Sequence, residues 1–73
     1  MDLPLYCIIG DRPVKAIETE SGGMEVMALN WKNGKFEREM KYLDRILSGD
    51  IEVSVVDEYD FQKKVEEIRS KLI

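Results

Sequence analysis

The sequence predicts a two-layer α+β domain, in which two helices lie on one face of a mostly antiparallel sheet of four to five strands. Apolar runs separated by glycine turns fill the first half of the chain, and these predict strands. The second half carries one helical pattern of apolar residues twice, on either side of a short alternating segment. The predicted order is β-β-β-(β)-α-β-α. The 73 residues are enough for a single domain, which covers residues 1–73.

The first half predicts a meander of short strands. Turn-forming residues follow the first strand, and Ser21-Gly22-Gly23 separates the second from the third. Asn33-Gly34 is typical of a type I′ hairpin turn, in which both central residues have positive φ. This turn would connect the third strand to a short fourth one. The predicted strands cover residues 5–9, 14–20, 24–30 or 24–31, and 35–38.

The third strand has apolar residues on both faces. Val26 and Ala28 fall on one face, and Met27, Leu29 and Trp31 fall on the other. This pattern is typical of a central strand. If both helices cover the same face of the sheet, one of these two sets lacks helical cover.

The first predicted helix covers residues 39–48 and ends at Gly49, a residue suited to the left-handed position after a helix. Phe36 and Glu37 suit both this helix and the preceding hairpin, so the boundary stays open. The apolar stripe recurs at spacings of four, three and four residues and consists of Phe36, Met40, Leu43 and Leu47.

A strand over residues 51–56 and a second helix over residues 58–72 complete the predicted fold. Asp57 is a good N-cap for this helix. Its apolar stripe repeats the spacing of the first and consists of Phe61, Val65, Ile68 and Leu72. We expect this stripe to pack on the sheet together with Leu43 and Leu47.

The charge of the chain argues against nucleic acid as a partner. The net charge is −4, and an acidic chain is repelled by phosphate backbones. The charge is uneven, at −3 for residues 1–30, +2 for residues 31–49 and −3 for residues 50–73. No apolar run is long enough to span a bilayer, and no signal peptide is visible, so we expect a cytoplasmic protein.

The sequence offers little chemistry for catalysis. It has no histidine, which removes the commonest general base and metal ligand. Cys7 is the only cysteine, and its apolar neighbours favour a buried, inert thiol over a nucleophile. We therefore expect no catalytic residue, no cofactor-binding residue and no metal ligand.

Two clusters of charge have a structural and a functional interpretation. The acidic cluster favours helix capping and solubility over a cation site, because its spacing matches no calcium loop. It consists of Asp50, Glu52, Asp57, Glu58 and Asp60. The basic cluster favours a solvated face, and its alternative role is contact with an acidic partner. It consists of Lys32, Lys35, Arg38, Lys41 and Arg45, of which the last three would share one helical face.

A set of short motifs along most of the chain resembles a group of short bacterial proteins of unassigned function. The motifs are Asp11-Arg12-Pro13-Val14-Lys15-Ala16, Gly22-Gly23, Leu29-Asn30-Trp31 with Gly34 and Phe36, Tyr42-Leu43, and a closing acidic helix. They coincide with turns, a hairpin and a helix. The resemblance implies a small α+β protein and carries no activity or site residue.

These observations predict a non-enzymatic module that binds a protein partner or forms a homodimer. The expected contact residues are Met27, Leu29 and Trp31, on the face without helical cover, because an exposed apolar face marks an interface. One alternative is an acidic inhibitor or immunity-type protein that blocks a basic active site. The other is a small enzyme or ligand-binding domain with carboxylates around a pocket.

Overall fold

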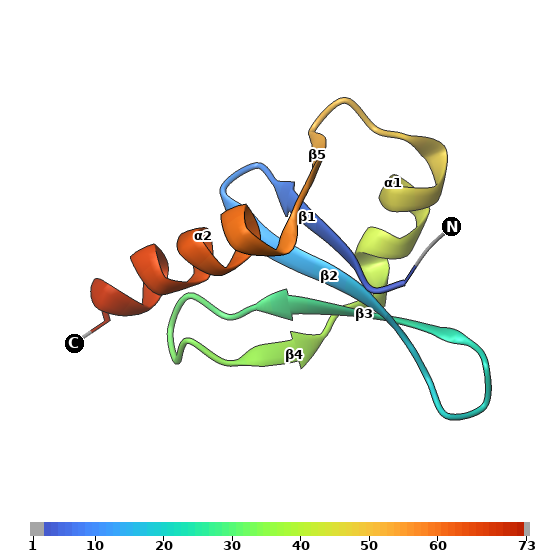
Figure 1. Ribbon diagram of the computed structural model, residues 1–73, viewed down its shortest axis with the longest axis horizontal. Helices are drawn as coiled ribbons and strands as arrows, with labels where there is room; N and C mark the ends of the chain where they lie inside the picture. Colours follow the sequence, from blue (N-terminus) through green and yellow to red (C-terminus); the bar gives the residue numbers. More distant parts are fainter. Residues whose placement is uncertain (1–2, 73) are drawn as a thin grey trace.

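The computed structural model describes residues 3–72, and these form one five-stranded sheet with two α-helices (Figure 1). The strand order is β4-β3-β2-β1-β5, and every neighbouring pair is antiparallel. The α+β class, the five strands and the predicted order of elements are confirmed. The strands are β1 (Leu5–Ile9), β2 (Arg12–Glu18), β3 (Met24–Leu29), β4 (Phe36–Arg38) and β5 (Val53–Val56).

The helices differ from the predicted ones mainly at their ends. A 3₁₀ turn, η1 (Met40–Tyr42), precedes α1 (Leu43–Ser48), and α2 spans Glu58–Ser70. The hairpin takes Phe36 into β4, so the first helix begins later than its apolar stripe predicts. The two predicted helix boundaries with clear local chemistry are confirmed. Gly49 ends α1 at φ 71°, and the Asp57 carboxylate accepts a hydrogen bond from the Asp60 N–H at 2.8 Å.

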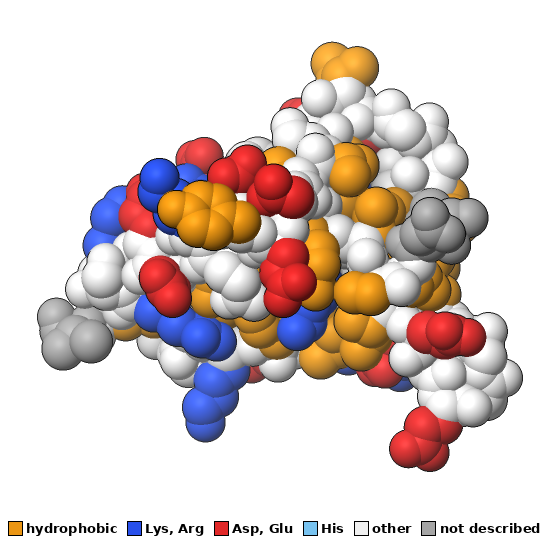
Figure 2. Space-filling model, viewed as in Figure 1, with side chains coloured by type: hydrophobic (Ala, Val, Ile, Leu, Met, Phe, Trp, Pro, Cys, Tyr) orange, Lys and Arg blue, Asp and Glu red, His pale blue; other side chains and the backbone are white. Residues whose placement is uncertain are grey.

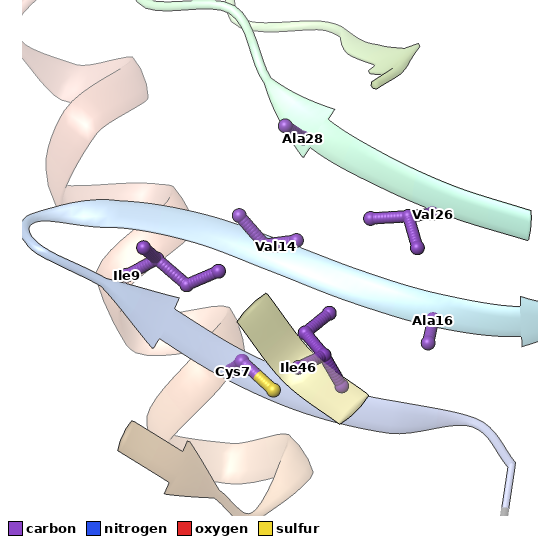
Figure 3. Packing of buried hydrophobic residues seen from close by; sticks show 7 residues of the cluster. All are labelled: Cys7, Ile9, Val14, Ala16, Val26, Ala28 and Ile46. Carbon is purple, nitrogen blue, oxygen red and sulfur yellow. The ribbon is translucent and has the colours of Figure 1, made fainter. Parts of the chain in front are cut away.

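The two helices lie on opposite faces of the sheet, which differs from the single covered face that the sequence predicts. Along β1, Cys7 and Ile9 pack in one core with Ile46 of α1, whereas Tyr6 and Ile8 pack in the other with α2. Successive side chains of a strand point to opposite faces, so this alternation places one helix on each side. In Figure 3, Ile46 lies over β1 and β2, while the ribbon of α2 passes behind them.

The core on the α1 side is made mostly by the three central strands. Pairing across them sets Cys7 opposite Val14, and Val14 opposite Ala28. The buried members of this core are Cys7, Ile9, Val14, Ala16, Val26, Ala28 and Ile46 (Figure 3).

The core on the α2 side is built around Phe61. Its ring centroid lies 4.8 Å from that of Tyr6 and 5.8 Å from that of Phe36. Leu29 and Val65 are the other fully buried members of this core. The predicted packing of Phe61, Val65 and Ile68 on the sheet is therefore confirmed.

The predicted roles of three leucines are wrong. Leu43 packs in the α1 core rather than with the stripe of α2. Leu47 and Leu72 are exposed, at 59% and 42%. The α1 helix has only six residues, so one residue, Ile46, is its buried contact with the sheet.

Candidate functional site

A groove of about 620 Å³ lies between the second half of α2 and the loops at one end of the sheet. Its apolar lining comes from Trp31, Ile68 and Leu72, while Asp11 and residues of α2 give it charged walls. Trp31 is 51% exposed, although it is the largest apolar side chain of the protein. We take this groove as the candidate site. The other charged lining residues are Lys64, Glu67 and Lys71.

The loop that carries Trp31 is held by side-chain amides. The Asn30 carboxamide oxygen accepts from the Lys32 N–H at 2.8 Å, which folds the backbone around Trp31. Asn33 does the same for the Lys35 N–H at 2.9 Å. The Asn30 and Asn33 amides also donate to one oxygen of Glu37, at 3.2 and 3.3 Å. These bonds fix the loop that presents the indole.

The turn itself is wider than the two-residue type I′ turn that Asn33-Gly34 predicts. The Asn30 N–H donates to the Lys35 carbonyl at 2.9 Å, so four residues lie between these partners. The Gly34 N–H donates back to the Asn30 carbonyl at 2.8 Å. Gly34 has the predicted positive φ, at 69°, but Asn33 does not. Trp31 lies in this wider loop, beyond the end of β3.

Arg12 supports the Trp31 ring. Its guanidinium carbon lies 5.6 Å from the ring centroids of both Trp31 and Tyr42. Nε donates to the Leu29 carbonyl at 2.8 Å, and Nη1 donates to the Tyr42 hydroxyl at 3.1 Å. A guanidinium held by two hydrogen bonds and placed against an aromatic ring restricts that ring and attracts its face. The indole of Trp31 is therefore held in place by Arg12 in the unliganded protein.

The other wall of the groove is attached to the same loop. Arg69 of α2 donates from Nε to the Gly34 carbonyl at 2.8 Å. A Cβ built on Gly34 would lie 3.1 Å from Cδ1 of Leu72 and 3.2 Å from Cγ of Arg69. Both the positive φ and the close approach thus favour glycine here. The end of α2 is thus in direct contact with the loop that carries Trp31.

Charges of both signs alternate around the groove. Lys64 lies 4.0 Å from an Asp11 oxygen and 3.8 Å from a Glu67 oxygen, and Lys71 lies 3.8 Å from the same Glu67 oxygen. The carboxylates and Lys71 are exposed and only Lys64 is partly buried, so their pairing contributes little stability. The alternation leaves the groove with apolar lining and no strong charge of one sign.

The three predicted contact residues do not share one surface. Leu29 is fully buried under α2, and its carbonyl is a partner of Arg12. Met27 is half-buried in β3, where it pairs with Lys15 and Arg38. Trp31 lies beyond β3, in the loop. The prediction that Val26 and Ala28 or Met27, Leu29 and Trp31 would lack helical cover fails because each face of the sheet has its own helix.

Cys7 is fully buried, as predicted. Burial raises the pKa of the Cys7 thiol, because the charged thiolate is poorly solvated there. Such a thiol is a weak nucleophile. Within residues 3–72, no three Cys, Asp or Glu side chains are grouped so as to hold a metal ion.

The basic cluster does not form one helical face. Arg38 lies on β4 and pairs with Glu25 at 3.4 Å, whereas Arg45 lies on α1 and pairs with Glu52 at 3.5 Å. Lys41 and Arg45 line a smaller hollow of about 250 Å³ with Tyr42. The central positive stretch is therefore divided between two edges of the molecule.

Sequence reasoning missed Arg12 and Arg69 as parts of the site. Arg12 reaches partners 17 and 30 positions away, and Arg69 reaches one 35 positions away. No local pattern predicts such contacts. The one usable signal was Gly34, because a glycine with positive φ often marks a close approach.

Among residues 3–72, no helix has the length and apolar character needed to cross a membrane. Comparisons with protein-family models, curated proteins and solved structures give no match to this chain.

Proposed function

We propose that this protein is a non-enzymatic interaction module that binds a partner protein through the groove beside Trp31. The observation that carries the proposal is a half-exposed tryptophan whose ring is already supported by Arg12. Tryptophan is among the residues most enriched at the energetic centres of protein interfaces. In a domain with so small a core, leaving an indole in water forgoes stabilisation that burial would give.

The support of the ring favours binding over a purely structural role. A side chain that is already ordered loses less conformational entropy when a partner covers it. The loop amides and Arg12 order Trp31, and Ile68 and Leu72 complete an apolar floor beside it. The alternating charges at the rim suit an apolar side chain of a partner with polar groups around it.

The partner is a second protein or a second copy of this chain, and we place the interaction in the cytoplasm. The single cysteine, which is buried, is compatible with a reducing compartment.

The test compares the native chain with Trp31→Ala, and uses Leu47→Ala as the control for loss of another exposed apolar side chain. Partners are captured on each immobilised chain, and the recovered protein is then purified. Its binding is measured by the fluorescence of Trp31, which is the only tryptophan. We expect a shift in emission on binding, and for Trp31→Ala, measured calorimetrically, a loss of affinity of about tenfold or more.

Light scattering over a concentration series shows whether the partner is a second copy of this chain. A dimer that Trp31→Ala abolishes and Leu47→Ala retains would assign the groove to self-association. Full affinity of Trp31→Ala for every partner, with unchanged folding by circular dichroism, would refute the proposal.

A further inference from the structure

The outer edge of β5 is open within residues 3–72, because β5 is the last strand of the sheet and pairs only with β1. The Gly10 N–H donates to the Glu52 carbonyl at 3.4 Å, which extends the pairing of these two strands. In an antiparallel ladder, alternate residues turn their backbone groups away from the neighbouring strand. Because Glu52 bonds to Gly10, directly after β1, the residues whose backbone groups turn away from β1 are Val53 and Val55. The Val53 N–H donates to the Asp50 carbonyl instead, at 3.0 Å. The pairing of Val55 with Cys7 places both backbone groups of Val55 on the outer side of the strand.

The edge lacks two of the features that usually prevent pairing with another chain, although the strand has only four residues. Edge strands are commonly protected by charged residues, proline or bulges, and the Val-Ser-Val-Val sequence of β5 contains no charge and no proline. Val55 is 65% exposed and Ile51 is 99% exposed. Of the six large apolar side chains exposed within residues 3–72, four lie between positions 47 and 59: Leu47, Ile51, Val55 and Tyr59. Figure 2 shows orange side chains over β5 and at the tip of the loop that precedes it.

Carboxylates lie on both sides of this strand. Asp50 and Glu52 precede it, and Asp57 and Glu58 follow it directly. With Asp60, the segment from 50 to 60 carries five acidic residues and no basic residue. Arg45 lies 3.5 Å from Glu52 and offsets part of the charge at one end. The edge is thus an apolar strand with negative charge at its two ends.

This charge arrangement disfavours a second copy as the occupant. Two copies of β5 paired antiparallel would bring the carboxylates before one strand next to those after the other. Like charges placed opposite one another across strands are destabilising. A strand with basic residues at both ends would instead meet opposite charge at each end.

We propose that the β5 edge binds an extended segment of a partner protein that has an apolar centre and lysine or arginine on both sides. The segment adds a sixth strand to the sheet, because Val55 offers its N–H and carbonyl at the free edge. The exposed side chains of Val55 and Ile51 contact the apolar centre of the segment, and the carboxylates select its charged ends. This surface is separate from the groove at Trp31, so the proposal stands or falls independently of that site.

The probe is the capped peptide KKVTVTVKK, with EEVTVTVEE as the matched control that keeps the apolar centre. Each is titrated into the isotopically labelled chain, and amide shifts are recorded by NMR. We expect the basic peptide to shift the amides of β5 and of Cys7 in β1, and the acidic peptide to leave them unchanged. Trp31→Ala should bind the basic peptide as the native chain does.

Two kinds of variant measure separately how the backbone N–H of Val55 and the flanking carboxylates contribute to peptide binding. Val55→Pro removes the outward N–H without breaking the ladder with β1, and should weaken binding roughly two- to tenfold. Glu52→Gln with Glu58→Gln should weaken it about two- to fivefold and reduce its salt dependence. Glu18→Gln with Glu20→Gln makes the same change of charge at the end of β2 and in the turn after it, which β1 separates from β5, and should have no effect.

If Val55→Pro does not fold, Glu52→Gln with Glu58→Gln still tests whether the peptide binds at the β5 edge. Absence of binding at millimolar basic peptide, or equal binding of the acidic peptide, would overturn the proposal. Concentration-dependent shifts of the β5 amides in the free chain would also overturn it, by assigning this edge to a second copy.

Discussion

Arg69 and Gly34 are joined by a hydrogen bond of 2.8 Å from the Arg69 Nε to the Gly34 carbonyl, across 35 positions of the chain. This bond connects the end of α2 to the loop that presents Trp31. It is accompanied by a close steric contact, since a Cβ at Gly34 would lie 3.1 Å from Cδ1 of Leu72 and 3.2 Å from Cγ of Arg69. The conformation of one turn and the position of one helix are therefore determined together.

Gly34→Ala should lower the free energy of unfolding by more than Gly49→Ala. Both glycines have nearly the same φ, at 69° and 71°, so the backbone penalty of about 1 kcal/mol is shared. A Cβ at Gly49 meets nothing within 4 Å, whereas one at Gly34 crowds Leu72 and Arg69. Urea denaturation of the two variants measures the difference. Equal losses of stability would show that α2 yields to the added methyl at no cost.

Ile46→Ala should destabilise the protein by about 2–4 kcal/mol, whereas Leu47→Ala should change its stability by less than about 0.5 kcal/mol. The two positions are adjacent in the same short helix, and they are 8% and 59% exposed. Ile46 packs in the core with Cys7 and Val14, so its truncation leaves a cavity there. Thermal and urea denaturation give both values. A larger loss at Leu47 would mean that α1 is rotated about its axis.

The stability of the protein should fall with rising pH above about 9, through the burial of Cys7. Burial raises the folded pKa of this thiol above its ordinary value of 9.0. Below that value the thiol is protonated in both states. Above it the unfolded chain releases the proton while the folded chain retains it, so stability is lost until the pH passes the folded pKa.

The measurement compares urea denaturation of the native chain and Cys7→Ala at several values from pH 7 to 11. Every other ionisable group is common to both proteins, so the difference between the curves isolates the thiol. Parallel curves would show that Cys7 contributes no pH dependence.

Local chemistry made much of the fold predictable from the sequence. Asp57 and Gly49 have the residue types that begin and end helices, and both do so here. The alternation and turn residues of the first half gave the strands in the right order. The placement of the helices was not accessible, because apolar residues on both faces of β3 are compatible with an open face or with a second covered one.

The candidate site was predictable only in part. Trp31 was identified by its residue type, but it was placed on the same face as Leu29 because the strand was extended into the loop. The chain turns earlier than Asn33-Gly34 suggests, since Asn30 binds the Lys32 N–H and folds the backbone there. Arg12 and Arg69 reach the site across long stretches of chain, and periodicity carries no information about such contacts.

Alternate side chains of β1 pack in different cores, and this arrangement specifies the register in which the strand pairs. A shift of this strand by one residue would turn Cys7 and Ile9 toward α2, and Tyr6 and Ile8 toward α1. The aromatic ring would then meet the close packing that accommodates a cysteine, while Phe61 would lose its ring partner. Packing would be lost in both cores at once, so neither core would stabilise the shifted register. The five residues of β1 thus disfavour a shifted strand register on both faces of the sheet.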